Sequence, residues 1–133
     1  MSDQNAASAY QRHAVQTANG PLLLLMLCDR MSVDIARAEV ALEASDNKAA
    51  NEHLQHAQKI VRMLRSALDP DGFQGAYELL AVYIFLEAHL IKANLEKDAA
   101  LVQECADLIR PIHEAWRKAV NANERADASS HMG

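Results

Sequence analysis

Apolar residues recur at alternating intervals of three and four along several long segments of this chain, which is the spacing of amphipathic α-helices. The clearest pattern predicts a helix over about residues 48–68. Its repeating apolar positions are Ala50, Leu54, Ala57, Val61, Leu64 and Leu68. A stripe of this kind is typical of a helix that packs along the seam of an antiparallel bundle.

Three further helices are predicted over about residues 21–44 and 76–95 and from Asp98 onward. Pro21 suits the first turn of a helix, because the N–H group that proline lacks would have no helical partner there. Residues 45–47 (Ser-Asp-Asn) are expected to end the first helix and to cap the next one. Asp98 is a suitable N-cap for the last helix.

Two features of the later helices lead to further expectations. The run Leu79–Leu86 is apolar on nearly every face, so the helix over 76–95 is expected to be the central and most buried one. Pro111 lies inside the apolar pattern of the last helix. We expect it to bend that helix, because proline removes a backbone donor and crowds the preceding turn.

Short connections place consecutive helices antiparallel. The predicted fold is therefore all-α, an antiparallel up-down four-helix bundle with a short N-terminal arm or helix. Residues 1–17 are interpreted as a mobile arm, 18–120 as the bundle domain, and 121–133 as a disordered tail. The last five residues, 129–133, resemble a remnant of an expression vector.

Composition agrees with this picture and narrows the function. Half of the 133 residues are hydrophobic, and only four Gly and three Pro are present, too few for a turn-rich β protein. The net charge is −5 and no basic run occurs, so nucleic acid and anionic membranes are not expected partners. Apolar runs are too short to cross a bilayer and no signal peptide is recognisable, which favours a cytoplasmic protein. Cys28 and Cys105 lie within apolar patterns and are interpreted as buried, reduced thiols.

No arrangement of residues predicts catalysis, a metal site or a cofactor. No Glu is followed three residues later by His, as a ferritin-like metal site in a bundle requires. His53 and His56 lack a third ligand and are interpreted as surface residues. His89 follows Glu87 by two residues, and a hydrogen-bonded structural histidine is favoured over a general base.

The most informative feature is a surplus of apolar residues. The run Leu22–Cys28 covers the whole circumference of its helix, although a stripe of about 100° suffices to reach a core. Some of these side chains must face outward, where the N-terminal arm, a second subunit or a bound partner could cover them. A groove for an amphipathic helical segment is the functional interpretation. The residues assigned to this groove are Leu22, Leu25, Met26, Cys28, Leu54, Ala57 and Val61.

The chain also resembles the flagellar secretion chaperones of the FliS family. The resemblance covers roughly residues 10–118 and rests on the order and spacing of short motifs. They are Tyr10, Val15-Gln16-Thr17-Ala18, Pro21-Leu22, Met26-Leu27-Cys28-Asp29, Asn51, Leu54, Ala57, Ile60-Val61, Leu64, Leu68-Asp69, Tyr83, Leu90, Ala93-Asn94, Asp98, Leu101-Val102 and Trp116. Where the family has an aromatic-Asp-Gly motif, this chain has Cys28-Asp29-Arg30.

This resemblance implies a bundle without catalytic activity that binds flagellin in the cytoplasm. The disordered C-terminal segment of flagellin would fold onto the bundle, which would prevent premature polymerisation and aid type III secretion. The flagellar export gate would be a further partner. The resemblance also implies that the N-terminal arm, here with Tyr10 and Val15, covers the groove when flagellin is absent.

Two other classes of function remain open from the sequence. One is a generic helical dimerisation or scaffold module whose patch Leu22–Cys28 pairs with itself. The other is a small bundle enzyme or ligand carrier that uses His89 and Glu87. A monomer or a weak homodimer is expected for the chaperone.

Overall fold

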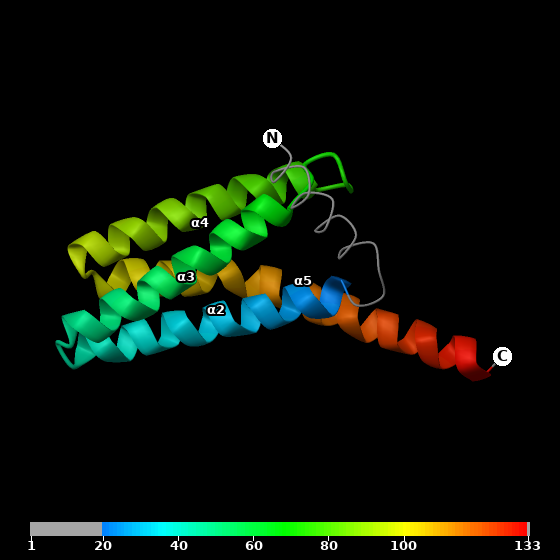
Figure 1. Ribbon diagram of the computed structural model, residues 1–133, viewed down its shortest axis with the longest axis horizontal. Coiled ribbons are helices and arrows are strands. Elements are labelled where there is room, and N and C mark those ends of the chain that lie inside the picture. Colours follow the sequence, from blue (N-terminus) through cyan, green and yellow to red (C-terminus); the bar gives the residue numbers. More distant parts are fainter. Residues whose placement is uncertain (1–19, 133) are drawn as a thin grey trace.

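The computed structural model describes residues 20–132, and the regular structure in this range consists of four α-helices. They are α2 (Gly20–Glu43), α3 (Asn47–Ala67), α4 (Ala76–Glu96) and α5 (Ala99–Met132). Successive helices run in opposite directions (Figure 1). The predicted all-α, up-down bundle is thus confirmed. The predicted arm over residues 1–17, with Tyr10 and Val15, lies outside the described residues.

Each helix of the bundle packs against two of the others. α2 contacts α3 and α5, and α4 contacts the same two helices. α2 and α4 do not contact each other, so they occupy opposite corners of the bundle. Their outward faces therefore point away from one another, which matters for the surfaces described below.

The turn between α2 and α3 is built by the residues that the sequence indicated. Ser45 adopts a left-handed conformation with φ of 57°, and the Asp46 N–H donates to the Ala41 carbonyl at 2.8 Å. The Asp46 side chain accepts a hydrogen bond from the Ala49 N–H at 3.1 Å. This is the predicted N-cap, and it satisfies a donor that the first turn of a helix leaves unpaired.

Local conformation also sets the start and end of α4 and the start of α5. Gly75 precedes α4 with φ of 91°, a conformation that strains residues with a Cβ atom. Lys97 ends α4 in a left-handed conformation, and the Asp98 side chain accepts from the Ala100 N–H at 2.9 Å. Asp98 therefore caps α5 as predicted.

The core is made mainly of aliphatic side chains from all four helices. Its fully buried members include Cys28, Met31, Ala38, Leu54, Ala57, Val61, Leu86, Leu90, Val102 and Cys105. Both thiols are buried and unpaired, as the sequence predicted. The predicted seam of α3 is buried over Ala50–Leu64, and Leu68, which follows the helix, is partly exposed and packs against the core.

A polar pair bridges each of the four helix–helix contacts. The pairs are Asp34–His56 between α2 and α3, Arg65–Glu87 between α3 and α4, His89–Glu104 between α4 and α5, and Asp29–His113 between α2 and α5. Asp34 has no exposed surface, so its carboxylate depends on His56 and on Arg30, whose Nε lies 3.7 Å away. Such buried charges favour one register of the packed helices, because a shift would leave them without partners.

The expectation that the helix over 76–95 is the most buried is wrong. Five large apolar side chains of α4 are exposed, and they are Tyr77, Ile84, Phe85, Ile91 and Leu95. The physical reason is the square arrangement, in which every helix has two neighbours and none is central. An apolar residue on the outer half of α4 therefore has no described helix to cover it.

α5 is longer than the sequence indicated. It continues through Pro111 and reaches Met132, whereas a disordered tail was predicted over 121–133. No Gly or Pro interrupts the chain between Pro111 and Gly133, and the segment is rich in Ala, which favours helix. In Figure 1 the last part of α5 extends beyond the other helices. Within the part of the chain described, no helix has the length and apolar character that crossing a membrane requires.

Candidate partner-binding surface

The structure divides the residues assigned to the groove into two sets. Cys28, Leu54, Ala57 and Val61 have no exposed surface and belong to the core, so they cannot line an open groove. The assignment of these four residues to a surface is therefore corrected. They face inward because α2 and α3 present the same stripes to each other that the sequence identified as core.

The remaining residues lie on the surface of the first half of α2. Leu22 is 44% exposed and Met26 is 58% exposed, while Leu25 is partly buried. Leu23 is also exposed, at 37%. The apolar run at the start of α2 thus points outward on one side and into the core on the other. This is expected of a run that covers the whole circumference of its helix.

The exposed apolar surface continues along the same face of α2. Met26, Val33 and Val40 recur every seven residues, and the two valines are 40% and 65% exposed. Together with Leu22 they form the α2 stripe, which spans about 27 Å at 1.5 Å per residue. The sequence analysis missed Val33 and Val40, although their seven-residue spacing from Met26 was visible in the sequence.

Charged side chains flank the α2 stripe. Arg30 and Arg37 are exposed on the side that faces α3, and Asp29 on the opposite side is paired with His113 of α5. A partner helix in this position would contact two guanidinium groups along one edge. The surface therefore favours an amphipathic segment that carries acidic residues on that edge.

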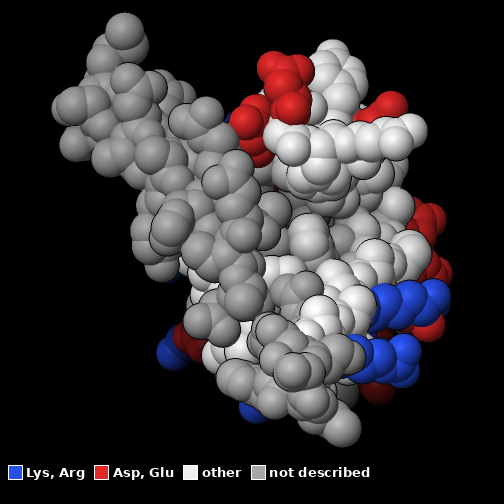
Figure 2. Space-filling view, turned by 90° about the vertical axis from the view of Figure 1, so that its right-hand side faces the viewer, with Lys and Arg blue, Asp and Glu red and all other residues white. Residues whose placement is uncertain are grey.

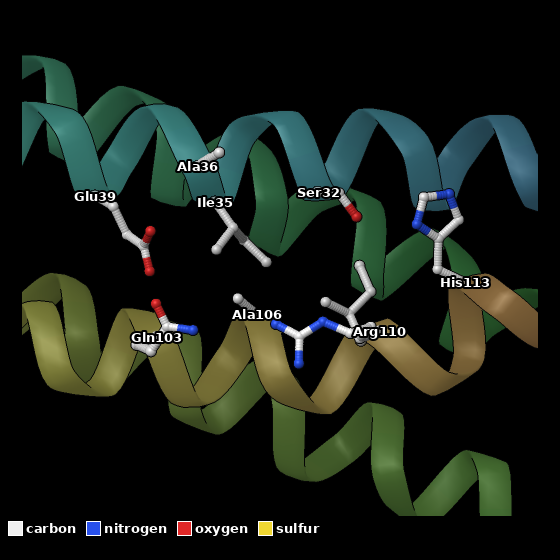
Figure 3. A pocket seen from close by; sticks show the side chains of 9 residues that line it. Ser32, Ile35, Ala36, Glu39, Gln103, Ala106, Arg110 and His113 are labelled. Carbon is white, nitrogen blue, oxygen red and sulfur yellow. The ribbon is translucent and has the colours of Figure 1, made fainter.

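A groove of about 270 Å³ lies between α2 and α5, beside the α2 stripe. Its lining residues are Ser32, Ile35, Ala36, Glu39, Gln103, Ala106, Ile109, Arg110 and His113. Figure 3 shows α2 contributing Ser32, Ala36 and Glu39 from one side, with Gln103 and Arg110 of α5 facing them. Ile35 and Ile109, which are 1% and 2% exposed, are the buried apolar residues of this lining.

In this groove, Glu39 places a carboxylate oxygen that has no hydrogen-bond donor among the described residues. Its Oε1 atom is buried and accepts no hydrogen bond from a described residue. In Figure 3 the carboxylate points toward Gln103 across the groove. A buried acceptor without a donor favours a partner that supplies an N–H group, such as a peptide backbone or amide side chain.

Figure 2 shows the end of the bundle at which α2 begins. A broad area of uncharged side chains occupies the middle of the described surface, with acidic side chains along its upper edge and basic side chains to the right. The described surface at this end is thus mainly uncharged, in keeping with the exposure of Leu22 and Met26.

The residues considered for catalysis do not come together. Glu87 pairs with Arg62 at 3.2 Å and with Arg65 at 2.6 Å, both on α3. His89 faces the other way, with its Nε2 atom 2.5 Å from Glu104 of α5, and its ring stacks on Phe85. The hydrogen bond expected for His89 is present, and its acid partner is Glu104 and not Glu87, the nearby acid in the sequence.

His56 differs from its interpretation as a surface residue. Its side chain is 44% exposed, but its Nδ1 atom bonds Asp34 inside the α2–α3 contact. No local pattern in the sequence links these two residues. Among the side chains that the structure describes, no group of three is arranged to hold a metal ion.

The fold and the surface together define a class of protein. A helical bundle with a long exposed apolar stripe is suited to binding another polypeptide. Comparison with known proteins gives the family. The chain matches the family described as flagellar protein FliS over residues 3–123.

Individual relatives agree with this match. The flagellar secretion chaperone FliS of Bacillus subtilis (strain 168) is 31% identical over 133 residues, which cover 100% of this chain and 98% of the relative. The protein of the same name from Salmonella typhimurium is 34% identical over 107 residues, 79% of each chain. That of Escherichia coli K12 is 28% identical over 109 residues, 80% of each chain. The chain belongs to the FliS family of flagellar secretion chaperones.

Proposed function

We propose that this protein is a cytoplasmic type III export chaperone that binds the disordered C-terminal segment of flagellin. Binding would prevent premature polymerisation of flagellin and aid its secretion during flagellum assembly, with the flagellar export gate as a further partner. Membership of the FliS family supports the chaperone role. The α2 stripe is the observation that carries the proposal for this chain, because it offers exposed apolar surface for a client helix.

The binding energy in this proposal comes from apolar burial. A disordered client loses conformational entropy when it folds onto the bundle. It must therefore bury a large apolar area, at about 25 cal/mol per Å², to compensate. Leu22, Leu25 and Met26 supply this area at one end of the stripe, and Val33 and Val40 extend it. Arg30 and Arg37 would set the orientation of the client by pairing with its acidic residues.

The buried residues of the original assignment have an indirect role in this proposal. Cys28, Leu54, Ala57 and Val61 hold α2 against α3 and so fix which face of α2 points outward. We also propose that residues 1–17, with Tyr10 and Val15, compete with flagellin for the stripe. The groove between α2 and α5 would receive the chain where it leaves the stripe, with Glu39 accepting from a client N–H group.

Met26→Glu tests the proposed surface. The side chain is 58% exposed, so the bundle should fold normally, as circular dichroism would show. A carboxylate placed beneath a bound helix costs at least about 2 kcal/mol, which weakens binding about 30-fold. Titration calorimetry with the C-terminal segment of flagellin measures this loss. Gln55→Glu, at an exposed position of α3, adds the same charge elsewhere and should leave the affinity unchanged.

Two outcomes of this titration would contradict the proposal. If Met26→Glu folds and binds flagellin as tightly as the parent chain, the α2 stripe is not the client surface. If neither the parent chain nor the variant binds flagellin, the client is a different protein.

A chain without residues 1–17 should bind flagellin more tightly. In the full chain a fraction of the molecules would have the α2 stripe covered by these residues, and only the uncovered fraction can bind the client. Unchanged affinity would remove the competing arm from the proposal.

A further inference from the structure

α4 carries a second exposed apolar surface, on its outward face. Six residues follow one another at intervals of four, three, four, three and four, and none is charged. They form the α4 stripe, which consists of Tyr77, Ala81, Ile84, Ala88, Ile91 and Leu95. All six are exposed, and the four large side chains range from 41% for Ile91 to 81% for Leu95. In Figure 1 α4 lies along one edge of the bundle, and no other described helix covers its outer side.

The spacing of the α4 stripe is that of the seam of a coiled coil. Alternate steps of three and four keep apolar residues in line along a facing helix, where each inserts between residues of the partner. The inner face of α4, with Tyr83, Leu86 and Leu90, already meets the core. α4 thus has two apolar faces on nearly opposite sides, and the bundle uses one of them.

When two α4 stripes are laid side by side in opposite directions, the large residues of one lie opposite the small residues of the other. We propose that α4 pairs with α4 of a second copy of this chain in the antiparallel direction. The two-fold axis would cross the α4 stripe midway between Ile84 and Ala88. Each large residue would then meet a small one at the centre of the contact. Ile84 would face the partner's Ala88, and Ala81 would face the partner's Ile91. Tyr77 would close each end against the partner's Leu95.

The charges beside the stripe fit the same register. Glu78 and Lys92 lie on one edge, on either side of Phe85. In the antiparallel pair Glu78 faces the partner's Lys92, twice by symmetry, and Phe85 lies beside the partner's Phe85. On the other edge Glu87 would approach the partner's Glu87, and Arg62 and Arg65 already neutralise that carboxylate. Opposite charges across the contact fix both register and direction.

This pairing leaves the proposed client surface free. α2 and α4 occupy opposite corners of the bundle and do not contact each other. The dimer would therefore present two α2 stripes on its outer sides. α4 has 21 residues and is about 31 Å long, so a single helix pair is small for a protein interface. We expect a dissociation constant on the order of tens of micromolar.

Sedimentation equilibrium of the purified full chain, from about 1 to 300 µM, tests the dimer. The parent chain should pass from monomer to dimer, and Ile84→Arg should remain monomeric with unchanged helical content. Glu78→Lys or Lys92→Glu alone should weaken dimerisation about three- to tenfold, because like charges then face each other. The two substitutions together should restore it. Glu52→Lys, at an exposed position of α3, is the matched control and should have no effect.

Cross-linking tests the proposed two-fold axis independently. Phe85→Cys should be joined to its copy by a short bismaleimide, because the two positions adjoin at the proposed two-fold axis. Val40→Cys, exposed on α2, should not be joined. The native thiols are buried and should not react in the folded chain.

A parent chain that stays monomeric over the whole range would overturn the proposal. So would dimerisation that Met26→Glu abolishes and Ile84→Arg does not, since the α2 stripe would then be the dimer contact. If Ile84→Arg loses flagellin binding while the parent chain is monomeric, the α4 stripe receives the client instead. The titration of Met26→Glu with flagellin tests the client surface separately, so the dimer and the proposed function can fail independently.

Discussion

At the scale of single residues, the two thiols show how the core controls chemistry. Burial, with a smaller contribution from the neighbouring Asp29 charge, raises the pKa of Cys28 from 9.0 to about 12. Burial and the Glu104 charge raise the pKa of Cys105 from 9.0 to about 12. Burial raises the pKa of Tyr83 in the same direction. These groups are held neutral, so the thiols are poor nucleophiles and poor metal ligands at neutral pH.

These pKa shifts predict a loss of stability at alkaline pH. The folded pKa of each thiol lies above its unfolded value of 9.0, so the unfolded chain loses these protons first. The stabilising contribution is complete below about pH 9 and is lost as the pH rises toward 12. Between pH 8 and 10.5 the free energy of unfolding should fall by about 2 to 4 kcal/mol.

Urea denaturation at a series of pH values measures this fall. The double variant Cys28→Ala, Cys105→Ala should show a clearly smaller dependence over the same range, although its stability at pH 8 is lower. An equal dependence in the variant would mean that other groups cause the alkaline loss.

At the scale of elements, a helix contributes stability through the face that it buries. α3 shows the cleanest separation, with Leu54, Val61 and Leu64 at 0–1% exposure along one side. The local signals for this element, its stripe and the Asp46 cap, agree with its tertiary role. α4 differs, because apolar residues on both of its faces give no local indication of which face is inside.

Two leucine substitutions compare these environments directly. Leu64→Ala should lower the free energy of unfolding by about 2–5 kcal/mol, because it deletes buried methyl groups and leaves a cavity. Leu95→Ala removes the same atoms from a side chain that is 81% exposed, and should cost less than about 0.5 kcal/mol. Chemical denaturation at low protein concentration measures both. Similar losses in the two variants would mean that Leu95 is covered in solution.

At the scale of the whole molecule, the bundle ends before its longest helix does. Val120 is 8% exposed and is the last buried residue of α5 in the described part of the chain. The described side chains after it are exposed. Before it, Trp116 packs against the core, and His113 pairs with Asp29 of α2. The folding unit therefore closes near residue 120.

Truncation at two points tests this boundary. A chain that stops after Val120 should keep its free energy of unfolding within about 1 kcal/mol, because it loses exposed residues. A chain that stops after Ile112 also loses Trp116, Val120 and the His113–Asp29 pair, and should be destabilised by about 3 kcal/mol or more. Thermal and urea denaturation measure both. Equal destabilisation by the two truncations would place part of the folding unit beyond residue 120.

The sequence by itself determined the helices, their caps and most of the core. These features depend on local spacing, on short side chains such as those of Asp46 and Asp98, and on stripes that can face only one way. The sequence also placed an apolar surplus at Leu22–Cys28, because no single stripe can bury a whole circumference. The family followed from the order of such short motifs along the chain.

Only the tertiary structure decided which way the uniformly apolar segments face. Cys28 and Leu86 lie inside and Met26 and Ile84 outside, although all four belong to uniformly apolar runs. The rotation of a helix about its own axis is set by its contacts with helices that are distant in the sequence. The same contacts bring together pairs such as Asp34 and His56, which are far apart in the sequence. Local periodicity does not contain this information, because α2 and α4 each have two apolar faces and the packing of their neighbours selects one.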